Sequence, residues 1–467
     1  MKYIGPFLRM NSLNLKNLEN QLFFFAKESL KHIVLKSRCG VTISPKNFKK
    51  SFPNNDINII KDFSPLLCVY KKANPKVIKD KEYSYWDSST FKKEIVPSSC
   101  AFMTLSIMEL INYYEGFKGI DDSMYQLSHL YKNLAKYQLD FYTSYLRNTD
   151  GVFIIKKNIS EDSSDELKFE EKESKFKFSD QALMMTAFLK YSLLEDGKDK
   201  EAYKSFSQDI LNMLLHFKDS LYDLSFEELN KIVFSLNISY CYEENPQVVN
   251  FIIDLIELLK SRYEESMVLQ EKIDHSSLFR INLMLSAKLC SLEHFSDISK
   301  VIRDSLLELY EKEKGIILKK SIKKEIKYSS EDLIFFILSM LIDNEDDDDK
   351  YISEIITDVY RHQIVNSKIL TSWPESPSLD SPERYLGFTR SSKHLMDEKN
   401  FKISTLDSPR DNEYSSVFLK SLEYNTRKET FTPSKISFDS TKNMNLIFII
   451  IFLLKDKVYD NYSITEE

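Results

Sequence analysis

Glycine is scarce in this chain of 467 residues, which contains only 8 glycines. No two of them form a G-x-G pattern, and none precedes Lys-Ser or Lys-Thr. A Rossmann fingerprint and a P-loop both need glycines where the backbone approaches a phosphate group. The sequence therefore contains neither nucleotide-binding motif in recognisable form, and we expect no cofactor.

Cysteine and histidine are also few and widely spaced. The five cysteines, at positions 39, 68, 100, 241 and 290, contain no C-x-x-C pair, which argues against structural zinc and against a disulfide framework. The seven histidines form neither H-x-x-x-H nor H-E-x-x-H, so we expect no metal site. These observations predict reduced thiols in a cytoplasmic protein.

Long hydrophobic runs are absent. The longest apolar run, residues 446–454, is too short to cross about 30 Å of hydrocarbon as a helix, so we interpret it as a buried core helix. Residues 1–10 lack the charged and apolar regions of a signal peptide. The net charge of −7 lacks the basic balance of a nucleic-acid binder. We therefore expect neither a membrane nor a nucleic acid as a partner.

What the chain does contain is helical periodicity along most of its length. Apolar residues recur at the spacing of one helix face and predict an all-α protein of about twelve helices. The expected helices are 15–34, 99–115, 121–146, 180–195, 199–218, 226–242, 247–263, 276–293, 297–313, 330–343, 350–366, 413–424 and 443–455.

Two segments repeat one local plan. In 150–183 and again in 314–333, a helix ends at a glycine, a short β-branched run and a charged stretch follow, and a Ser/Asp pair starts the next apolar helix. Such a repeat is typical of stacked helical hairpins joined by short β-ribbons. Three irregular insertions, 46–98, 156–178 and 367–410, interrupt what we interpret as a single helical domain over residues 1–467.

The first repeat resembles the six-hairpin (α/α) toroid proteins, which include glycoside hydrolases and sugar epimerases. The similar residues run from Asp150-Gly151-Val152-Phe153 through the charged ribbon to Phe178-Ser179-Asp180-Gln181-Ala182. The resemblance covers residues 150–191 and, more loosely, 314–341. It implies an (α/α) toroid whose inner helices surround a central cleft. An open α-solenoid is the alternative fold.

The same resemblance implies that catalytic carboxylates project from the starts of the inner helices. Asp180, at a helix start after the ribbon, is the first candidate, with Asp150 before the glycine turn and Asp87 beside Trp86 as the others. Two of these residues have an ordinary structural explanation as well. Asp180 can cap its helix, and Asp150-Gly151 is a common turn dipeptide.

The segment 371–414 supplies candidate ligand-binding residues. Its aromatic and charged side chains lie on a proline-stiffened loop that could cover the cleft or form a surface lid held by ion pairs. Two arginines occupy neighbouring places in a repeated Leu-Asp-Ser-Pro motif and could bind a carboxylate or a phosphate. The candidates, together with Trp86, are Trp373, Arg384, Tyr385, Arg390, Arg410 and Asp411.

Two functions from different classes remain open. One is an enzyme that acts on a carbohydrate-like ligand by acid–base chemistry between carboxylates. The other is a non-catalytic helical scaffold that binds a partner protein or peptide. Convergence of the candidate residues in one concave pocket favours the enzyme, because fold alone does not decide function.

Overall fold

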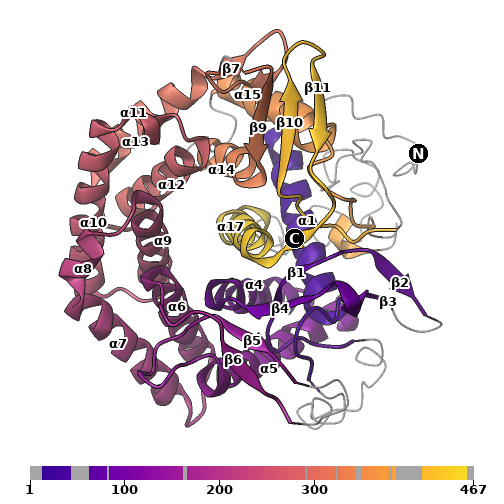
Figure 1. The fold of residues 1–467 in the computed structure, drawn as a ribbon, viewed down its shortest axis with the longest axis vertical. Helices are drawn as coiled ribbons and strands as arrows, with labels where there is room; N and C mark the ends of the chain where they lie inside the picture. Colours follow the sequence, from indigo (N-terminus) through magenta and orange to yellow (C-terminus); the bar gives the residue numbers. More distant parts are fainter. Residues whose placement is uncertain are drawn as a thin grey trace.

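The structure is a computed structural model that describes residues 13–43, 63–80, 84–160, 166–290, 292–321, 323–342, 349–375, 377, 381–384 and 413–459. These residues form twelve helices of ten residues or more, which are arranged in two concentric layers around a ring (Figure 1). The protein is an (α/α) toroid, as the sequence predicts.

Six helices of the described chain form the inner layer. Each contacts the next, and the last contacts the first, so that the inner ring is closed. Around the ring they are α4 (Pro97–Glu115), α6 (Phe178–Leu194), α9 (Phe226–Tyr242), α12 (Ile273–Cys290), α14 (Ser330–Leu341) and α17 (Ser440–Tyr459).

The outer layer pairs with the inner one, helix by helix. Its members are α1 (Leu15–Leu35), α5 (Asp122–Tyr145), α7 (Lys200–His216), α10 (Pro246–Glu265), α13 (Glu293–Leu307) and α15 (Lys350–Val359). Short helices α8 (Lys218–Tyr222) and α11 (Met267–Gln270) connect successive pairs, and a π-helical turn η3 (Tyr360–Val365) continues α15.

Burial explains which helix takes which layer. In α14, eleven of twelve residues are buried, whereas in α13 only four of fifteen are. A helix that is apolar on every face is covered on every face, while an amphipathic helix covers the core with one face and meets water with the other. The all-round apolar sequences of α4, α6 and α14 therefore place these helices inside.

The two ends of the chain close the ring. The inner helix α17 is partnered by α1, the first helix of the described chain, and it also contacts α4 and α14. This closure rules out the open solenoid. Residues 446–452 of α17 are at most 6% exposed, which confirms the buried core helix expected there. Among the described residues, none of the helices combines the length and apolarity that a membrane crossing requires.

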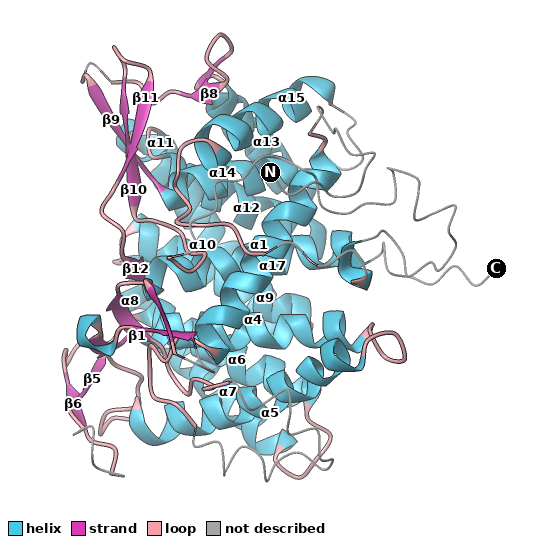
Figure 2. Cartoon of the chain, turned by 90° about the vertical axis from the view of Figure 1, so that its right-hand side faces the viewer, coloured by secondary structure: helices cyan, strands magenta, loops and turns pink. Residues whose placement is uncertain are grey.

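Short strands gather on one side of the ring (Figure 2). A five-stranded antiparallel sheet has the order β12-β1-β4-β5-β6, and a three-stranded sheet has the order β11-β10-β9. The strands are β1 (Tyr70–Ala73), β4 (Lys92–Ile95), β5 (Lys156–Asn158), β6 (Phe169–Glu171), β9 (Glu325–Ser329), β10 (Ser421–Asn425), β11 (Thr430–Pro433) and β12 (Phe438–Asp439). Two hairpins pair β2 (Val77–Lys79) with β3 (Ser84–Trp86) and β7 (Tyr310–Glu311) with β8 (Ile316–Ile317).

The two repeated segments have the geometry that their sequence predicts. Gly151 and Gly315 both have positive φ angles, of 84° and 64°, which favour glycine because it lacks a Cβ atom. After Gly315 the chain forms β8 and β9, and α14 then begins with a capping box in which Ser329 and Asp332 bond each other's backbone. After Gly151 the chain forms the ribbon β5–β6 and then α6.

Two sequence-based expectations differ from the structure. Residues 46–98 were expected to be irregular, yet their described part contains β1 to β4, two of which pair with segments far along the chain. The helix expected over 413–424 is wrong. Its last four residues belong to β10, which lies between β9 and β11, and the two ladders of backbone hydrogen bonds outweigh the local helical spacing.

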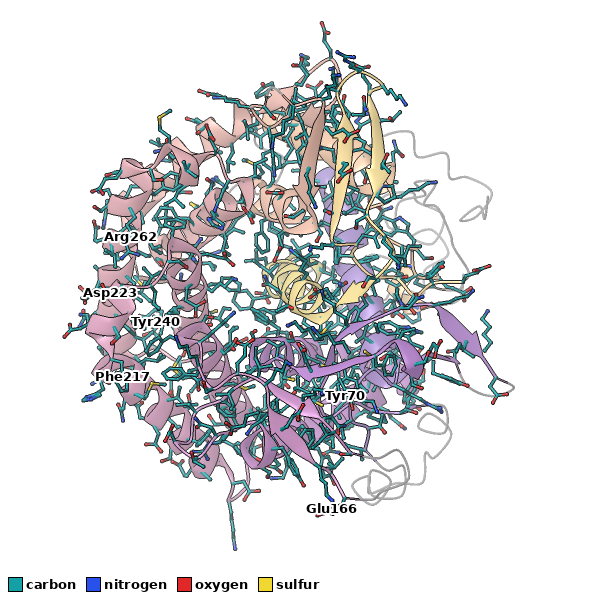
Figure 3. All side chains as sticks on the ribbon, in the orientation of Figure 1. Tyr70, Glu166, Phe217, Asp223, Tyr240 and Arg262 are labelled. Carbon is teal, nitrogen blue, oxygen red and sulfur yellow. The ribbon has the colours of Figure 1, made fainter. Side chains whose placement is uncertain are left out.

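The outer layer is tied together by contacts to backbone carbonyl groups. Arg262 of α10 donates to the carbonyl oxygens of Tyr222 and Leu224, the latter at 2.5 Å, and so joins α10 to the end of α8. Arg262 and Asp223 lie on the outer rim of the ring (Figure 3), whereas Tyr70 lies within the sheet-bearing part and accepts a hydrogen bond from Asn158. The outer rim thus has a structural role.

Candidate functional site

The inner helices bring their first turns together at one end of the ring. Strand β4 leads into α4, β9 into α14 and β12 into α17, so these helices begin on the side where the strands lie (Figure 2). We call this end the mouth. It contains polar first-turn residues from all six inner helices, namely Ser98, Ser99, Ser179, Asp180, Glu227, Glu228, Asp274, His275, Glu331, Asp332 and Lys442, with Lys231 in the second turn of α9.

Side-chain contacts show that neighbouring first turns meet. The backbone N–H of Ser179 on α6 donates to Glu228 on α9 at 3.0 Å. Glu227 on α9 lies 3.8 Å from the Nε2 atom of His275 on α12. Lys442 on α17 forms an ion pair with Glu331 on α14, and Ser440 on α17 bonds Ser99 on α4 at 3.2 Å. The mouth is therefore a continuous polar ring.

Asp180 is, with Asp332, one of the buried carboxyl groups of this ring. It is 3% exposed, and burial raises its pKa to about 6, while a hydrogen bond from Ser98 opposes the rise. Helix α6 begins at Phe178 without a side-chain cap, so Asp180 does not cap the helix as its position after Ser179 suggested. A carboxyl group with this pKa can hold or release a proton near neutral pH.

On α9, a neighbouring positive charge lowers the pKa of a carboxyl group instead of raising it. Burial alone would raise the pKa of Glu227, but Lys231, at 2.5 Å, outweighs it and lowers the pKa of this carboxyl. The mouth thus contains carboxyl groups whose pKa values are moved in opposite directions. Such a pair can provide one proton donor and one permanent anion.

A cavity of about 360 Å³ opens at the mouth between α12, α14, α17 and the three-stranded sheet. Every residue that lines it is polar: Glu271, Lys272, Asp274, His275, Lys319, Lys327, Ser329, Asp332, Lys420, Ser421 and Lys442. Its size falls within the range of small-molecule sites, which are usually lined mainly by apolar side chains. We call this cavity the mouth pocket.

Asp274 and His275 stand side by side in the mouth pocket. Burial, with the nearby charge of Asp332, raises the pKa of the Asp274 carboxyl. Burial also lowers the pKa of His275, so its imidazole is neutral at pH 7. The buried Nδ1 atom of His275 has no hydrogen-bond partner among the described residues. The neutral imidazole of His275 can therefore accept a proton, while the Asp274 carboxyl group holds its proton more strongly than an exposed aspartate does.

The sequence-predicted carboxylates are placed as follows. Asp180 lies at the mouth but does not line the mouth pocket. Asp150 is exposed in the turn before Gly151, where it contacts Asn148. Asp87 caps the short 3₁₀ helix η1 (Ser88–Thr90), and its hydrogen bonds from Ser89 lower its pKa. A catalytic role for each stays a prediction.

The two predicted tryptophans contact α1 rather than the mouth pocket. Trp86 is fully buried, donates to Ser415 at 2.6 Å and stacks on His32. Trp373 is half-buried and packs edge-on against Phe25. Both side chains belong to the packing between α1 and the segments beside it.

The predicted lid is described only in part. Its short helix η4 (Pro382–Arg384) docks on α1, where buried Glu383 bonds Lys27 at 2.5 Å and Tyr113 at 2.6 Å. The structure describes the backbone of Arg384 but not its side chain. Four other predicted residues, Tyr385, Arg390, Arg410 and Asp411, lie outside the described residues. Their role in binding stays a prediction.

Sequence reasoning missed the residues of the mouth pocket. Asp274 and His275 are adjacent in sequence at the start of an apolar helix, which is the signal that could have identified them. Asp332 and the lysines come from four segments between positions 272 and 442, and no local pattern connects them. Within the described segments, no group of three His, Cys, Asp or Glu side chains is arranged to hold a metal ion.

The opposite end of the inner ring is closed. Glu109 near the end of α4 forms ion pairs with Lys190 of α6, at 3.2 Å, and with Lys455 of α17, and it accepts from Tyr242 of α9. Its side chain is 1% exposed. Burial would raise the pKa of Glu109, but the two ammonium groups outweigh this and lower it. This cluster joins four inner helices and contributes no open site.

Neither a protein-family model nor a curated protein sequence matches the chain. Among solved structures it is similar to a sugar epimerase from a ruminal bacterium, with 9% identity, a TM-score of 0.49, and coverage of 88% of this chain and 99% of the other. A cellobiose 2-epimerase from Bacillus thermoamylovorans has 9% identity and a TM-score of 0.49, covering 93% and 100%. A D-mannose isomerase has 7% identity and a TM-score of 0.48, covering 93% and 99%.

Proposed function

We propose that the protein binds a carbohydrate-like polyhydroxyl ligand in the mouth pocket and acts on it by acid–base chemistry. The observation that carries this proposal is the composition of the lining, in which all eleven residues are polar. Hydroxyl groups of such a ligand can donate to carboxylates and accept from ammonium groups on the same wall. An apolar ligand would leave these groups desolvated and unpaired.

The acid–base part of the proposal rests on Asp274 and His275. Asp274 has a raised pKa, so its carboxyl group releases a proton less readily than an exposed aspartate does. His275 has a lowered pKa, so its imidazole is neutral and can accept a proton. Two titratable groups beside one cavity, one with a raised pKa and one with a lowered pKa, can transfer protons to and from a bound molecule. Asp180, on the other flank of α9, is the second candidate donor.

Binding can be tested by thermal unfolding of the full chain with glucose, mannose and cellobiose. We expect at least one sugar to raise the Tm, because a ligand that binds only the folded state stabilises it. Proton abstraction can be tested by NMR detection of deuterium incorporated from D₂O at the carbon beside the sugar carbonyl. We expect His275→Gln to abolish this exchange.

His294→Gln is the matched control. His294 is 54% exposed on α13 and faces Glu257 outside the mouth pocket, so its loss should leave exchange unchanged. If no sugar shifts the Tm, the proposed ligand class is wrong. If a sugar binds but exchange is equal in the parent and His275→Gln, His275 is not the base.

The alternative function is that of a helical scaffold that binds a partner protein or peptide. This function would need an exposed apolar surface on which the partner docks. The most exposed large apolar side chains of the described residues are Met267 and Val268 on α11 and Val301 on α13, at 76%, 66% and 71%. Isolated apolar side chains of this kind are common on protein surfaces. The polar pocket therefore supports a small ligand more strongly than these residues support a docked peptide.

We also propose a reducing, cytoplasmic environment. All five cysteines are free thiols, and Cys39, Cys68 and Cys100 are buried. Burial raises the pKa of Cys68, and its proximity to the other two raises it further. Three neighbouring thiols that stay unpaired are typical of proteins kept under reducing conditions.

A further inference from the structure

The sign of the charge in the mouth pocket differs from that of the whole chain. Five lysines and three carboxyl groups line the cavity, so with His275 neutral its net charge is +2, whereas the chain as a whole carries −7. A local reversal of charge around a cavity concentrates ligands of the opposite sign.

Two of the five lysines already have partners. Lys319 is paired with Asp332 at 2.7 Å, and Lys442 is paired with Glu331. The other three, Lys272, Lys327 and Lys420, have no carboxylate partner among the described residues. Their ammonium groups are therefore available to a ligand, while the paired lysines hold the wall in place.

The three-stranded sheet aligns further donors with these lysines. Ser329 on β9 lies directly opposite Ser421 on β10, so both side chains are on one face of the sheet. Lys327, two residues before Ser329, is on that same face because side chains alternate along a strand. The N-terminal turns of α12 and α14 also begin at this wall, and helix N-termini favour negative charge.

We propose that the ligand of the mouth pocket carries a phosphate monoester, which is bound by Lys272, Lys327 and Lys420. This inference rests on the proposed function, since it names the class of ligand for the same pocket. The lining contains lysine but no arginine. Lysine binds phosphate as a compact point charge, while an arginine fork would match phosphate and carboxylate alike, so the charge of the lining is what favours phosphate. A phosphate monoester carries nearly two negative charges at pH 7, which balances the charge of the lining.

The test compares ligands at constant ionic strength by isothermal titration calorimetry with the full chain. The probes are mannose, mannose 6-phosphate, glucuronate and inorganic phosphate. We expect mannose 6-phosphate to bind at least about tenfold more tightly than mannose, because charge-assisted hydrogen bonds are added. We expect this advantage to weaken as salt rises.

The variant that tests the assignment is the double substitution Lys327→Gln with Lys420→Gln. Both lysines are exposed at the pocket rim, so the fold should tolerate their loss. We expect the Kd for mannose 6-phosphate to rise about tenfold. The control is Lys324→Gln with Lys428→Gln, which removes the same charge at the far end of the same sheet and should change the Kd less than about twofold.

Each other outcome overturns a defined part of the proposal. Equal binding of mannose and mannose 6-phosphate contradicts the phosphate site but leaves the proposed function standing. Tighter binding of glucuronate than of the phosphate ester assigns a carboxylate instead. Binding of inorganic phosphate that is equal in the parent and the Lys327/Lys420 variant places the anion elsewhere. If none of the four probes binds, both proposals are wrong.

Discussion

At the scale of single residues, burial decides which groups can do chemistry. Asp150 and Asp180 are separated by only one ribbon in sequence, but Asp150 is exposed and Asp180 is 3% exposed. The same carboxyl group is therefore an ordinary turn residue at one position and a proton carrier with a pKa of about 6 at the other. Neither composition nor spacing distinguishes the two.

The raised pKa of Asp180 gives a prediction for stability. An acid with a raised pKa in the folded state contributes stability below its unfolded pKa of 3.8, and this is lost as the pH rises through about 6. The full loss is about 3 kcal/mol, of which about 2 kcal/mol falls between pH 4.5 and 7.5. Asp180→Asn removes this ionisable group. In urea unfolding, the free energy of unfolding of the variant minus that of the parent should therefore rise by about 2 kcal/mol between pH 4.5 and 7.5.

Asp150→Asn is the control for this experiment, because its exposed carboxyl group lies in a turn. It should change the unfolding free energy by the same amount at both pH values. A constant difference between Asp180→Asn and the parent at pH 4.5 and 7.5 would show that Asp180 has an ordinary pKa.

At the scale of elements, side-chain amides hold extended segments against helices. Gln181 on α6 bonds both the N–H and the carbonyl oxygen of Phe153, at 3.0 and 2.8 Å. Asn443 on α17 does the same for Phe418, and Gln363 in η3 does so for Ile317. Each amide completes the hydrogen bonds of a buried backbone that no neighbouring strand satisfies.

This arrangement predicts the effect of Gln181→Leu. The substitution keeps the volume of the side chain but leaves the N–H and carbonyl groups of Phe153 unpaired in the core. We expect the free energy of unfolding to fall by about 2 to 4 kcal/mol, measured by urea denaturation. Gln247→Leu, at an exposed position on α10, should change it by less than about 0.5 kcal/mol. Equal effects would mean that the amide does not hold the ribbon.

At the scale of the whole molecule, the ring is closed at one end and polar at the other. Glu109 joins α4 to α6, α9 and α17 at the closed end, while the first turns of the inner helices form the mouth. Because the six inner helices contribute their positive N-termini to one end, carboxyl groups such as those of Asp180, Asp274 and Asp332 are favoured there. The pocket is thus a consequence of the toroid and of its helix direction.

Closure of the ring predicts the effect of Glu109→Gln. The substitution leaves Lys190 and Lys455 without their carboxylate in a largely buried setting, at 17% and 19% side-chain exposure. We expect a loss of about 3 kcal/mol or more in the free energy of unfolding. Glu243→Gln breaks a surface pair with Lys204 and should cost less than about 1 kcal/mol. Similar losses would show that the buried cluster has no special role in closing the ring.

Much of the fold follows from the sequence by itself, because its signals are local. The 3.6-residue periodicity predicts all twelve long helices, most of them within a few residues of their ends, although α13 and α15 end earlier than expected. Gly151 and Gly315 lie at the positive φ angles that their turns require. The length and flanks of residues 446–454 predict the buried helix that α17 contains. These features depend on the residues next to one another in the chain.

The site was decided by tertiary structure alone. Asp274 and His275 are adjacent on α12, whereas Asp332 belongs to α14 and Lys420 precedes β10, and only the ring places these segments around one cavity. The strand β10 replaced an expected helix because its partners β9 and β11 outweigh local spacing. The pKa values of Asp180 and His275 likewise depend on burial, which is a property of contacts between distant segments. Local patterns determine helices, whereas charge, burial and convergence arise when the ring closes.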